Sequence, residues 1–389
     1  MGRGEISAAA GLMPVCRFSG AVVTERFRLG HASGGDWRQL AAQCAAQLGE
    51  QPGNLGFFYV TDYFASHSAA IAGELRRLTG VEHWAGSVGI GICATGIEYL
   101  DQPALVTLAG NFAPDSFRLF GSEAGHPNAG MLRCGDGPPS IAVVHGDAQS
   151  ADITKQVQAL ATLTESGFVV GGLASSRRRC SNYANGLAAG ALSGVAFSDG
   201  VTVATRLTQG CSPLGAARRI TGAQNNIVLE LDGRPALEVL REDVGISDNE
   251  ELSQLGGQIF VGLAVTGADI EDYVVRNLIG IDPANRLIAV GDLVQKGQRL
   301  RFFRRDHESA RSDMQRMLDS IREGLYTKPR GALYFSCLGR GGALLGGESA
   351  ELKMIEAAMG DVPLAGFFGN GEISRNLVYG YTGVLMLFL

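Results

Sequence analysis

Three segments of the chain combine a short, continuous apolar run with a longer stretch in which apolar residues recur every three or four positions. The short runs are LGFFYVT (55–61), SIAVVH (140–145) and GALYFSC (331–337). Runs of this length are typical of buried strands, and the helical spacing predicts amphipathic helices. The predicted helical stripes are Ile71, Leu75 and Leu78; Ile153, Val157 and Leu160; and Leu352, Ile355 and Met359.

The three segments also end alike. Each predicted helix is followed by a glycine-containing run, which is VEHWAGSVGIGI, FVVGGLASS or VPLAGFFGNGEI, and then by PALVTLAG, GALSGVAFS or TGVLMLFL. The spacings from residue 61 to 86, from 145 to 171 and from 337 to 366 are 25, 26 and 29 residues. Such agreement predicts an internal repeat, and we call the three copies repeats A, B and C.

Each repeat predicts a strand, a crossover helix, a second strand and a third strand. The crossover makes the first two strands parallel and the connection right-handed. A short turn before the third strand makes that strand antiparallel. The predicted fold class is therefore α/β, with mixed sheets covered by helices and divided into two domains.

The pattern changes between repeats B and C. NNIVLEL, GGQIFVGLAV, NRLIAVGD and QRLRFFRRD predict strands, and Asp306 is the candidate N-cap of an amphipathic helix. The apolar face of this helix is formed by Ala310, Met314, Met317 and Ile321. We expect an N-terminal extension (1–29), a first domain with repeats A and B (30–218) and a second domain (219–389).

Composition narrows the class of protein. Among 389 residues, 46% are hydrophobic and 19% are charged, which is typical of a globular chain. The net charge of −6 argues against nucleic-acid binding, and no apolar run is long enough to span a membrane. The seven cysteines include no CxxC pair, which disfavours a zinc ribbon and favours free thiols in a reducing cytoplasm.

Candidate ligand-binding residues lie where strands end. Ligands of open α/β sheets bind outside the carboxyl ends of the strands. Cys337 ends the first strand of repeat C, and the repeat places His145 and Thr61 equivalently in repeats B and A. Glycines there let backbone and ligand approach closely. The candidate glycines are Gly171, Gly172 and Gly341.

Four polar side chains of repeat C are candidates for contact with a ligand or for a reactive thiol. The guanidinium of Arg340 suits a bidentate contact with a ligand carboxylate, or an ion pair with Glu372. Cys337 is either a thiol activated by Arg340 or a buried structural cysteine. Glu372 and Asn370 could form hydrogen bonds with an amine or hydroxyl of a ligand. An asparagine between glycines also suits a turn.

Several motifs together resemble the FIST family, with an N-terminal FIST domain and a FIST C-terminal domain. They are VVGG (169–172), ELDGRPALEVL (230–240), RRDHESARSDM (304–314), SCLGRG (336–341) and PLAGFFGNGEI (363–373). The resemblance covers about residues 30–389. It implies a sensory module of signal transduction that binds a small ligand and acts through a partner.

The chain also resembles the freestanding NosP-type members of that family. This resemblance implies a b-type haem that senses nitric oxide and a histidine kinase as partner. An axial imidazole would come from His145, with His83 as second choice. Three alternatives stay open: a sensor of an amino-acid-like ligand without haem, an interaction scaffold without a ligand, and an enzyme with Cys337 as nucleophile and His145 as base. A homo-oligomer is also compatible with the sequence.

Overall fold

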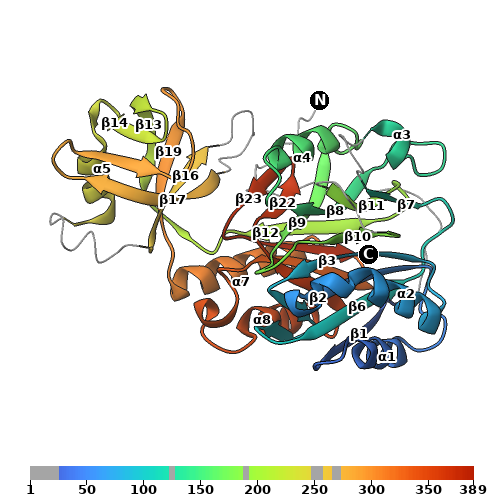
Figure 1. Ribbon diagram of the computed structural model, residues 1–389. Coiled ribbons are helices and arrows are strands. Elements are labelled where there is room, and N and C mark those ends of the chain that lie inside the picture. Colours follow the sequence, from blue (N-terminus) through green and yellow to red (C-terminus); the bar gives the residue numbers. More distant parts are fainter. Residues whose placement is uncertain (1–25, 122–127, 187–191, 247–256, 265–272) are drawn as a thin grey trace, which may run out of the picture. The chain divides into compact units, whose positions relative to one another are not determined.

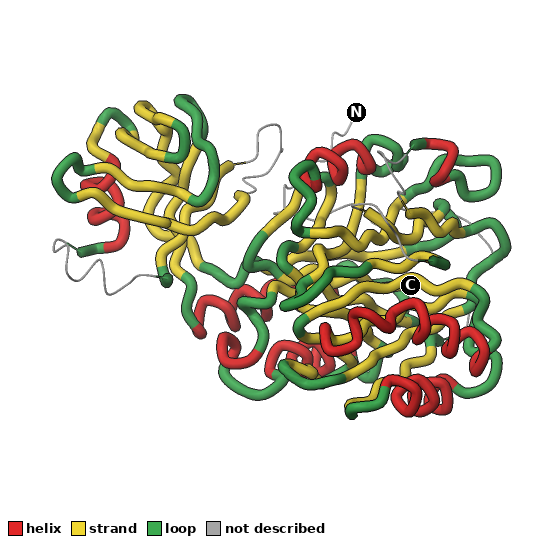
Figure 2. Tube along the Cα trace, viewed as in Figure 1, coloured by secondary structure: helices red, strands yellow, loops and turns green. Residues whose placement is uncertain are grey.

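The structure is a computed structural model that describes residues 26–121, 128–186, 192–246, 257–264 and 273–389 (Figure 1). The chain forms two compact units. We call Cys211–Ala310 the insert unit, and residues 26–210 together with Arg311–Leu389 the repeat unit. In the repeat unit, helices lie on the outside of layered strands (Figure 2). No helix among the described residues is both long and apolar enough to cross a membrane.

Repeats A, B and C each build a sheet around a central strand that has one parallel and one antiparallel neighbour. The central strands are β2 (Leu55–Thr61), β8 (Ile141–Asp147) and β20 (Gly331–Cys337). Their parallel neighbours are β3 (His83–Gly89), β9 (Phe168–Ala174) and β21 (Leu364–Gly369). Their antiparallel neighbours are β6 (Ala104–Gly110), β11 (Leu192–Phe197) and β24 (Gly383–Phe388). The predicted α/β repeat with mixed sheets is confirmed.

The predicted crossover helices lie between the paired strands. They are α2 (Ser68–Thr79), α4 (Ile153–Ala161) and α8 (Ala350–Met359). Their predicted stripes are buried except for Leu78, which is 38% exposed, and α2 also buries Ala72. The sequence did not predict β1 (Arg28–Ser33), which pairs with β6, or α1 (Trp37–Leu48), which follows it.

The repeats exchange short strands in a cycle. In repeat A, β3 is followed by the short strand β4 (Gly91–Ala94), which pairs with β21 of repeat C. Repeat C sends β22 (Glu372–Arg375) to pair with β9 of repeat B. Repeat B sends β10 (Asn182–Ala184) to pair with β3 of repeat A. Each sheet is therefore completed by a strand from another repeat.

This exchange changes the expected division into domains. The predicted second domain, 219–389, is split, because repeat C folds with repeats A and B in the repeat unit. The physical reason is the backbone pairing of β4 with β21 and of β22 with β9. Other strands of these sheets are β5 (Ile97–Leu100), β7 (Phe117–Gly121), β12 (Val203–Thr208) and β23 (Leu377–Tyr379).

Hydrogen bonds lock the points where the exchanged segments leave their sheets. The Ser175 N–H donates to the Val88 carbonyl oxygen at 3.2 Å, and the Ser175 hydroxyl donates to the Phe368 carbonyl oxygen. The Ile90 N–H donates to the same hydroxyl at 2.9 Å. Segments of all three repeats therefore meet at one serine, which satisfies backbone groups that leave the regular ladders.

The close approach of the central and parallel strands requires glycine in every repeat. A Cβ atom would lie 1.7–2.1 Å from a carbonyl oxygen of the central strand at three equivalent positions: Gly86, Gly171 and Gly366. Those distances are far below van der Waals contact. The predicted site residue Gly171 is thus explained by strand packing.

The insert unit contains one sheet that closes on itself, because its first strand also pairs with a strand near the opposite edge. Its longest strand, β13 (Ser212–Gln224), pairs with β19 (Arg299–Arg304) along one part and with β14 (Ile227–Leu231) along another. The remaining elements are β15 (Arg234–Pro235), α5 (Ala236–Val244), β16 (Ile259–Ala264), β17 (Tyr273–Asp282) and β18 (Leu287–Val290). The predicted strands of this region are confirmed.

The predicted helix after the insert strands is α7 (His307–Glu323). The Asp306 carboxylate accepts a hydrogen bond from the Ser309 N–H at 2.8 Å, which confirms the predicted N-cap. The predicted apolar face is buried along its length: Ala310, Met314, Met317 and Ile321.

The glycine requirement gives a testable prediction. We expect Gly366→Ala to lower the free energy of unfolding by about 1–3 kcal/mol or more, because the added methyl group overpacks against the Tyr334 carbonyl. Gly73→Ala is the control, since Gly73 is exposed on α2 and a Cβ there meets nothing within 4 Å. It should stabilise the protein by about 0.5–1 kcal/mol. Equal effects in urea unfolding would contradict the packing argument.

Candidate functional site

A row of four residues crosses the sheet of repeat B. Glu372 pairs in register with Gly172, Gly172 with His145, and His145 with Ser193. Residues in register on neighbouring strands project from the same face of a sheet. Val143, two residues before His145, belongs to the core formed jointly by the three sheets, so this row faces that core. The structure thus brings together three predicted site residues and adds Ser193.

Three side chains of this row carry a buried polar atom that has no hydrogen-bond partner among the described residues. These atoms are Glu372 Oε1, His145 Nδ1 and Ser193 Oγ, on residues that are 0% exposed. Buried polar groups almost always have partners, and each unsatisfied one costs about 1–3 kcal/mol. A row with three such atoms is therefore a candidate for ligand binding.

The equivalent rows of the other repeats differ. In repeat C the row is wholly apolar: Ile92, Phe367, Phe335 and Val384. In repeat A it is Asn182, Ser87, Tyr59 and Val106, and the Ser87 hydroxyl donates to Asn182 Oδ1 at 2.8 Å. The fold therefore does not itself require unsatisfied polar groups at this level.

His145 lies deeper than the sequence predicted. Strand β8 continues to Asp147, so Asp147 occupies the position of Thr61 and Cys337, whereas His145 corresponds to Tyr59 and Phe335. The His145 ring centroid lies 5.5 Å from that of Tyr59 and 6.3 Å from that of Phe335. The sequence prediction ended this strand at His145, two residues early.

The imidazole of His145 is neutral. Burial lowers its pKa to about 3, and its Nε2 lies 3.2 Å from the Tyr59 hydroxyl. The ring also packs against Phe335 and Phe367, and the residue is 0% exposed. A porphyrin would have to displace these aromatic side chains before its iron could reach either ring nitrogen. This arrangement does not fit an axial haem ligand.

His83, the second candidate, is held in an unsuitable tautomer. The Asn185 side-chain oxygen accepts from the Trp84 N–H at 3.0 Å, which directs the Asn185 amide nitrogen to His83 Nδ1 at 2.8 Å. Nδ1 therefore accepts a hydrogen bond, and the proton of the neutral ring lies on Nε2. Neither nitrogen offers a free lone pair to iron. Among the described residues, no group of three or more His, Cys, Asp or Glu side chains could hold a metal ion.

Arg340 is buried in an ion pair. Its Nε and Nη2 donate to Glu351 Oε1 at 2.8 and 2.5 Å, and both residues are 1% exposed. The same carboxylate accepts from the Tyr334 hydroxyl at 2.6 Å and the Ser336 hydroxyl at 2.9 Å. The sequence offered a ligand or Glu372 as the partner, and the structure supplies Glu351. One signal could have found it, because Glu351 precedes Ile355 by four residues on the buried face of α8.

Glu372 is an uncharged carboxyl at neutral pH. Its Oε2 accepts from the Thr382 N–H at 3.1 Å and the Thr382 hydroxyl at 2.6 Å. Burial raises its pKa to about 8, and the negative charge of Glu351 acts in the same direction. These effects outweigh the hydrogen bonds from Thr382 and the positive charge of Arg340, which lower the pKa.

The remaining predicted site residues lie around the glycine loop 338–349. Cys337 is half-buried, and its N–H donates to the Thr382 carbonyl at 2.8 Å. Gly341 is half-buried beside Phe368, which a Cβ there would meet at 3.0 Å. Asn370 is exposed, with its N–H bonded to the Leu173 carbonyl at 3.0 Å, as expected for a turn residue.

One carboxyl that the sequence did not predict also contacts this loop. Glu98 on β5 accepts a hydrogen bond from the Gly342 N–H at 3.2 Å. Burial raises the pKa of Glu98 to about 7. Glu98 of repeat A and Glu372 of repeat C are therefore two carboxyls whose pKa is raised by burial.

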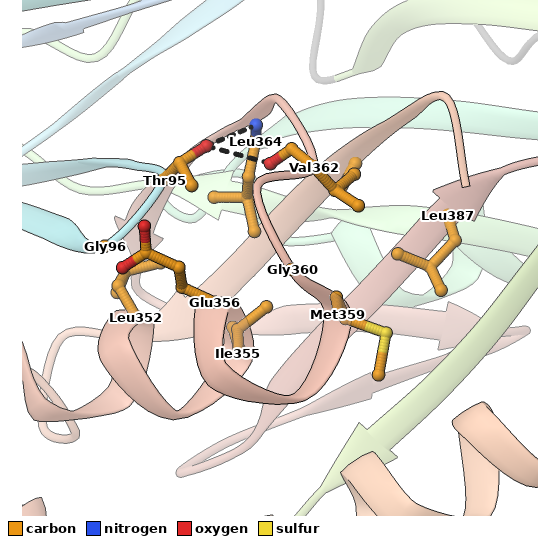
Figure 3. A pocket seen from close by; sticks show the side chains of 11 residues that line it. Thr95, Gly96, Leu352, Ile355, Glu356, Met359, Gly360, Val362, Leu364 and Leu387 are labelled. Atoms are coloured by element: carbon orange, nitrogen blue, oxygen red, sulfur yellow. Dashed lines mark hydrogen bonds between the residues drawn. The ribbon is translucent and has the colours of Figure 1, made fainter. Parts of the chain in front are cut away.

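A small cavity lies between α8 and its sheet (Figure 3). Its volume is about 10 Å³, which is at the lower limit for one water molecule. The Thr95 hydroxyl in its wall donates to the Val362 carbonyl and accepts from the Leu364 N–H, both at 2.9 Å. This wall is satisfied, so the cavity is a packing gap rather than a ligand site.

Comparison with known proteins identifies related sequences. The chain matches the FIST N domain over residues 54–234 and the FIST C domain over residues 236–375. Two uncharacterized proteins from Mycobacterium tuberculosis strains CDC 1551 / Oshkosh and H37Rv are each 30% identical over 391 residues, covering 94% of this chain and 100% of the relative. An uncharacterized protein of Mycobacterium bovis is 29% identical over 393 residues, covering 94% of this chain and 99% of the relative.

The two buried glutamates should respond differently to loss of charge. Glu351→Gln leaves the Arg340 guanidinium buried without a counter-ion, and we expect the free energy of unfolding to fall by about 3–5 kcal/mol. Glu372→Gln is the matched control, because an amide replaces a carboxyl that is already neutral and can still accept from Thr382. It should not lower the free energy of unfolding at pH 7, and it should raise it, because the wild-type carboxyl can ionise only on unfolding at that pH. Similar large losses in both variants would be inconsistent with a neutral Glu372.

Glu372 should also make stability depend on pH. Its folded pKa of about 8 exceeds its ordinary value of 4.5, so its contribution is fully present below about pH 4.5 and is lost progressively as pH rises from there through about 8. The slope from this group approaches about 1.4 kcal/mol per pH unit. Urea unfolding of the wild type and of Glu372→Gln between about pH 5 and 9 measures the difference. Parallel curves for the two proteins would refute this assignment.

Proposed function

Because the chain belongs to the FIST family, whose domains are found in signal-transduction sensor proteins, we propose that it senses a small amino-acid-like ligand at Glu372. The observation that carries the proposal is Glu372 Oε1, a fully buried carboxyl oxygen to which no group in the described part of the chain donates a hydrogen bond. The other oxygen of the same carboxyl is held by Thr382, which fixes its orientation. Because Oε2 accepts both hydrogen bonds from Thr382, Oε1 carries the proton of the neutral carboxyl, and it becomes a positioned acceptor once that proton is released.

An ammonium group is the complement that this carboxyl favours. Burial keeps Glu372 neutral, and an opposite charge at hydrogen-bond distance restores the charged form. The resulting ion pair forms in a buried site, where Coulombic attraction is stronger than in water. Neutral His145 and the Ser193 hydroxyl, which share the row, add uncharged hydrogen-bonding capacity.

A ligand carboxylate would compete with Glu351 for Arg340. The guanidinium already donates two hydrogen bonds to Glu351, and its Nη1 lies 3.5 Å from the Tyr381 carbonyl oxygen. Exchange of Glu351 for a ligand carboxylate would free the first turn of α8, which bears Glu351, and the loop that bears Arg340. A ligand shifts a conformational equilibrium only if it binds the two states differently, and this exchange supplies that difference.

We propose that a signalling partner such as a histidine kinase binds the loop that bears Arg340 and recognises its altered conformation. The second candidate function is a haem-based nitric-oxide sensor with the same kind of partner, supported by the resemblance to freestanding family members. It requires a histidine arrangement different from those of His145 and His83 described above. An absorbance spectrum of protein produced with haem available separates the two candidates, because a Soret band that withstands gel filtration would favour haem.

A catalytic role for Cys337 with His145 as base is a weaker proposal. The base would need to lie at the strand end, where the structure has Asp147. Cys337→Ala tests it directly: retained ligand binding and signalling in that variant would exclude a nucleophilic role.

Ligand binding should depend on pH through Glu372. An ammonium ligand pairs with the carboxylate, so binding below pH 8 releases a proton, and Kd should fall about tenfold per pH unit up to about pH 8. Thermal-shift screening with the twenty amino acids identifies the ligand, and calorimetry at several pH values measures Kd. Glu372→Gln should bind at least tenfold more weakly without this pH dependence. Wild-type affinity in that variant would overturn the proposal.

A further inference from the structure

The polar row of repeat B contains a second feature that does not depend on the proposed function. We propose that His145 and Ser193 hold one ordered water molecule between them in the core. They are directly opposite on the antiparallel pair β8 and β11. His145 Nδ1 and Ser193 Oγ are both buried and have no hydrogen-bond partner within the described ranges, and both residues are 0% exposed. Directly opposed side chains on such a pair lie close enough to share one bridging molecule.

Comparison of the three repeats supports space for a water molecule at this position. The corresponding pairs are Tyr59 with Val106 in repeat A and Phe335 with Val384 in repeat C. Histidine is smaller than tyrosine or phenylalanine, and serine is smaller than valine. Repeat B therefore places less side-chain volume on the same backbone, and it does so with polar atoms. Space and polarity together are what a buried water requires.

The hydrogen-bonding chemistry also matches water. Within the described residues, the Tyr59 hydroxyl lies at hydrogen-bonding distance from His145 Nε2, and its proton is satisfied when Tyr59 donates to that nitrogen. The imidazole proton then lies on Nδ1, which needs an acceptor. A water molecule accepts from Nδ1 and donates to Ser193 Oγ, which also has lone pairs available. The result is a continuous chain from Tyr59 through His145 and water to Ser193.

A crystal structure at about 1.5 Å resolution tests the site directly. The wild type should show a density peak within hydrogen-bonding distance, about 2.7–3.2 Å, of both His145 Nδ1 and Ser193 Oγ. The peak should be absent from Ser193→Val, whose larger side chain fills the space. A wild-type map with no peak, or with Ser193 bonded directly to His145, overturns the proposal.

The order of stability among variants gives an independent test. Ser193→Ala leaves room for the water molecule on His145. Ser193→Val displaces the water and leaves the His145 Nδ1–H group without a hydrogen-bond acceptor. We therefore expect the alanine variant to have the larger folding equilibrium constant, by about tenfold. At the equivalent position of repeat C the order should reverse, with valine preferred over alanine, because Val384 lies opposite Phe335. A higher stability with valine than with alanine at both residue 193 and residue 384 would mean that no water molecule is bound at the site.

Discussion

The backbone exchange among the three repeats is the constraint on which the repeat unit depends. No repeat completes its own sheet, because β4, β10 and β22 each pair with a strand of another repeat. The exchange brings backbone segments of different repeats close together, and glycine permits that approach, because a Cβ atom at Gly369 would lie 2.6 Å from the Leu173 carbonyl oxygen. The high glycine content therefore reflects packing among repeats as much as turns.

The same exchange builds the candidate site. Glu372 belongs to repeat C in sequence, yet β22 places it in the sheet of repeat B, in register with Gly172 and beside His145. Thr382 links this row to the glycine loop, because its N–H and hydroxyl hold Glu372 while its carbonyl accepts from the Cys337 N–H. A change at Glu372 is thus connected through Thr382 to the loop that carries Arg340.

The sequence predicts the repeats but not their assembly. Apolar runs and helical stripes locate the central strands and crossover helices because both patterns are local. The exchanged strands have only three or four residues, too few for a pattern, and their partners are distant in sequence. Arg340 and Glu372 are recognisable as unusual residues, but their partners Glu351 and Thr382 depend on tertiary packing. Ser193 was missed because a single serine in an apolar run is compatible with any buried strand.

The central claim is that this assembly keeps Glu372 buried as a neutral carboxyl. Infrared difference spectroscopy of the wild type against Glu372→Gln measures that protonation state directly. The account predicts a protonated carboxyl band that is present at pH 6.5 and disappears with a midpoint near the pKa of about 8. A band that disappears with a midpoint near the ordinary glutamate value of 4.5 would contradict it.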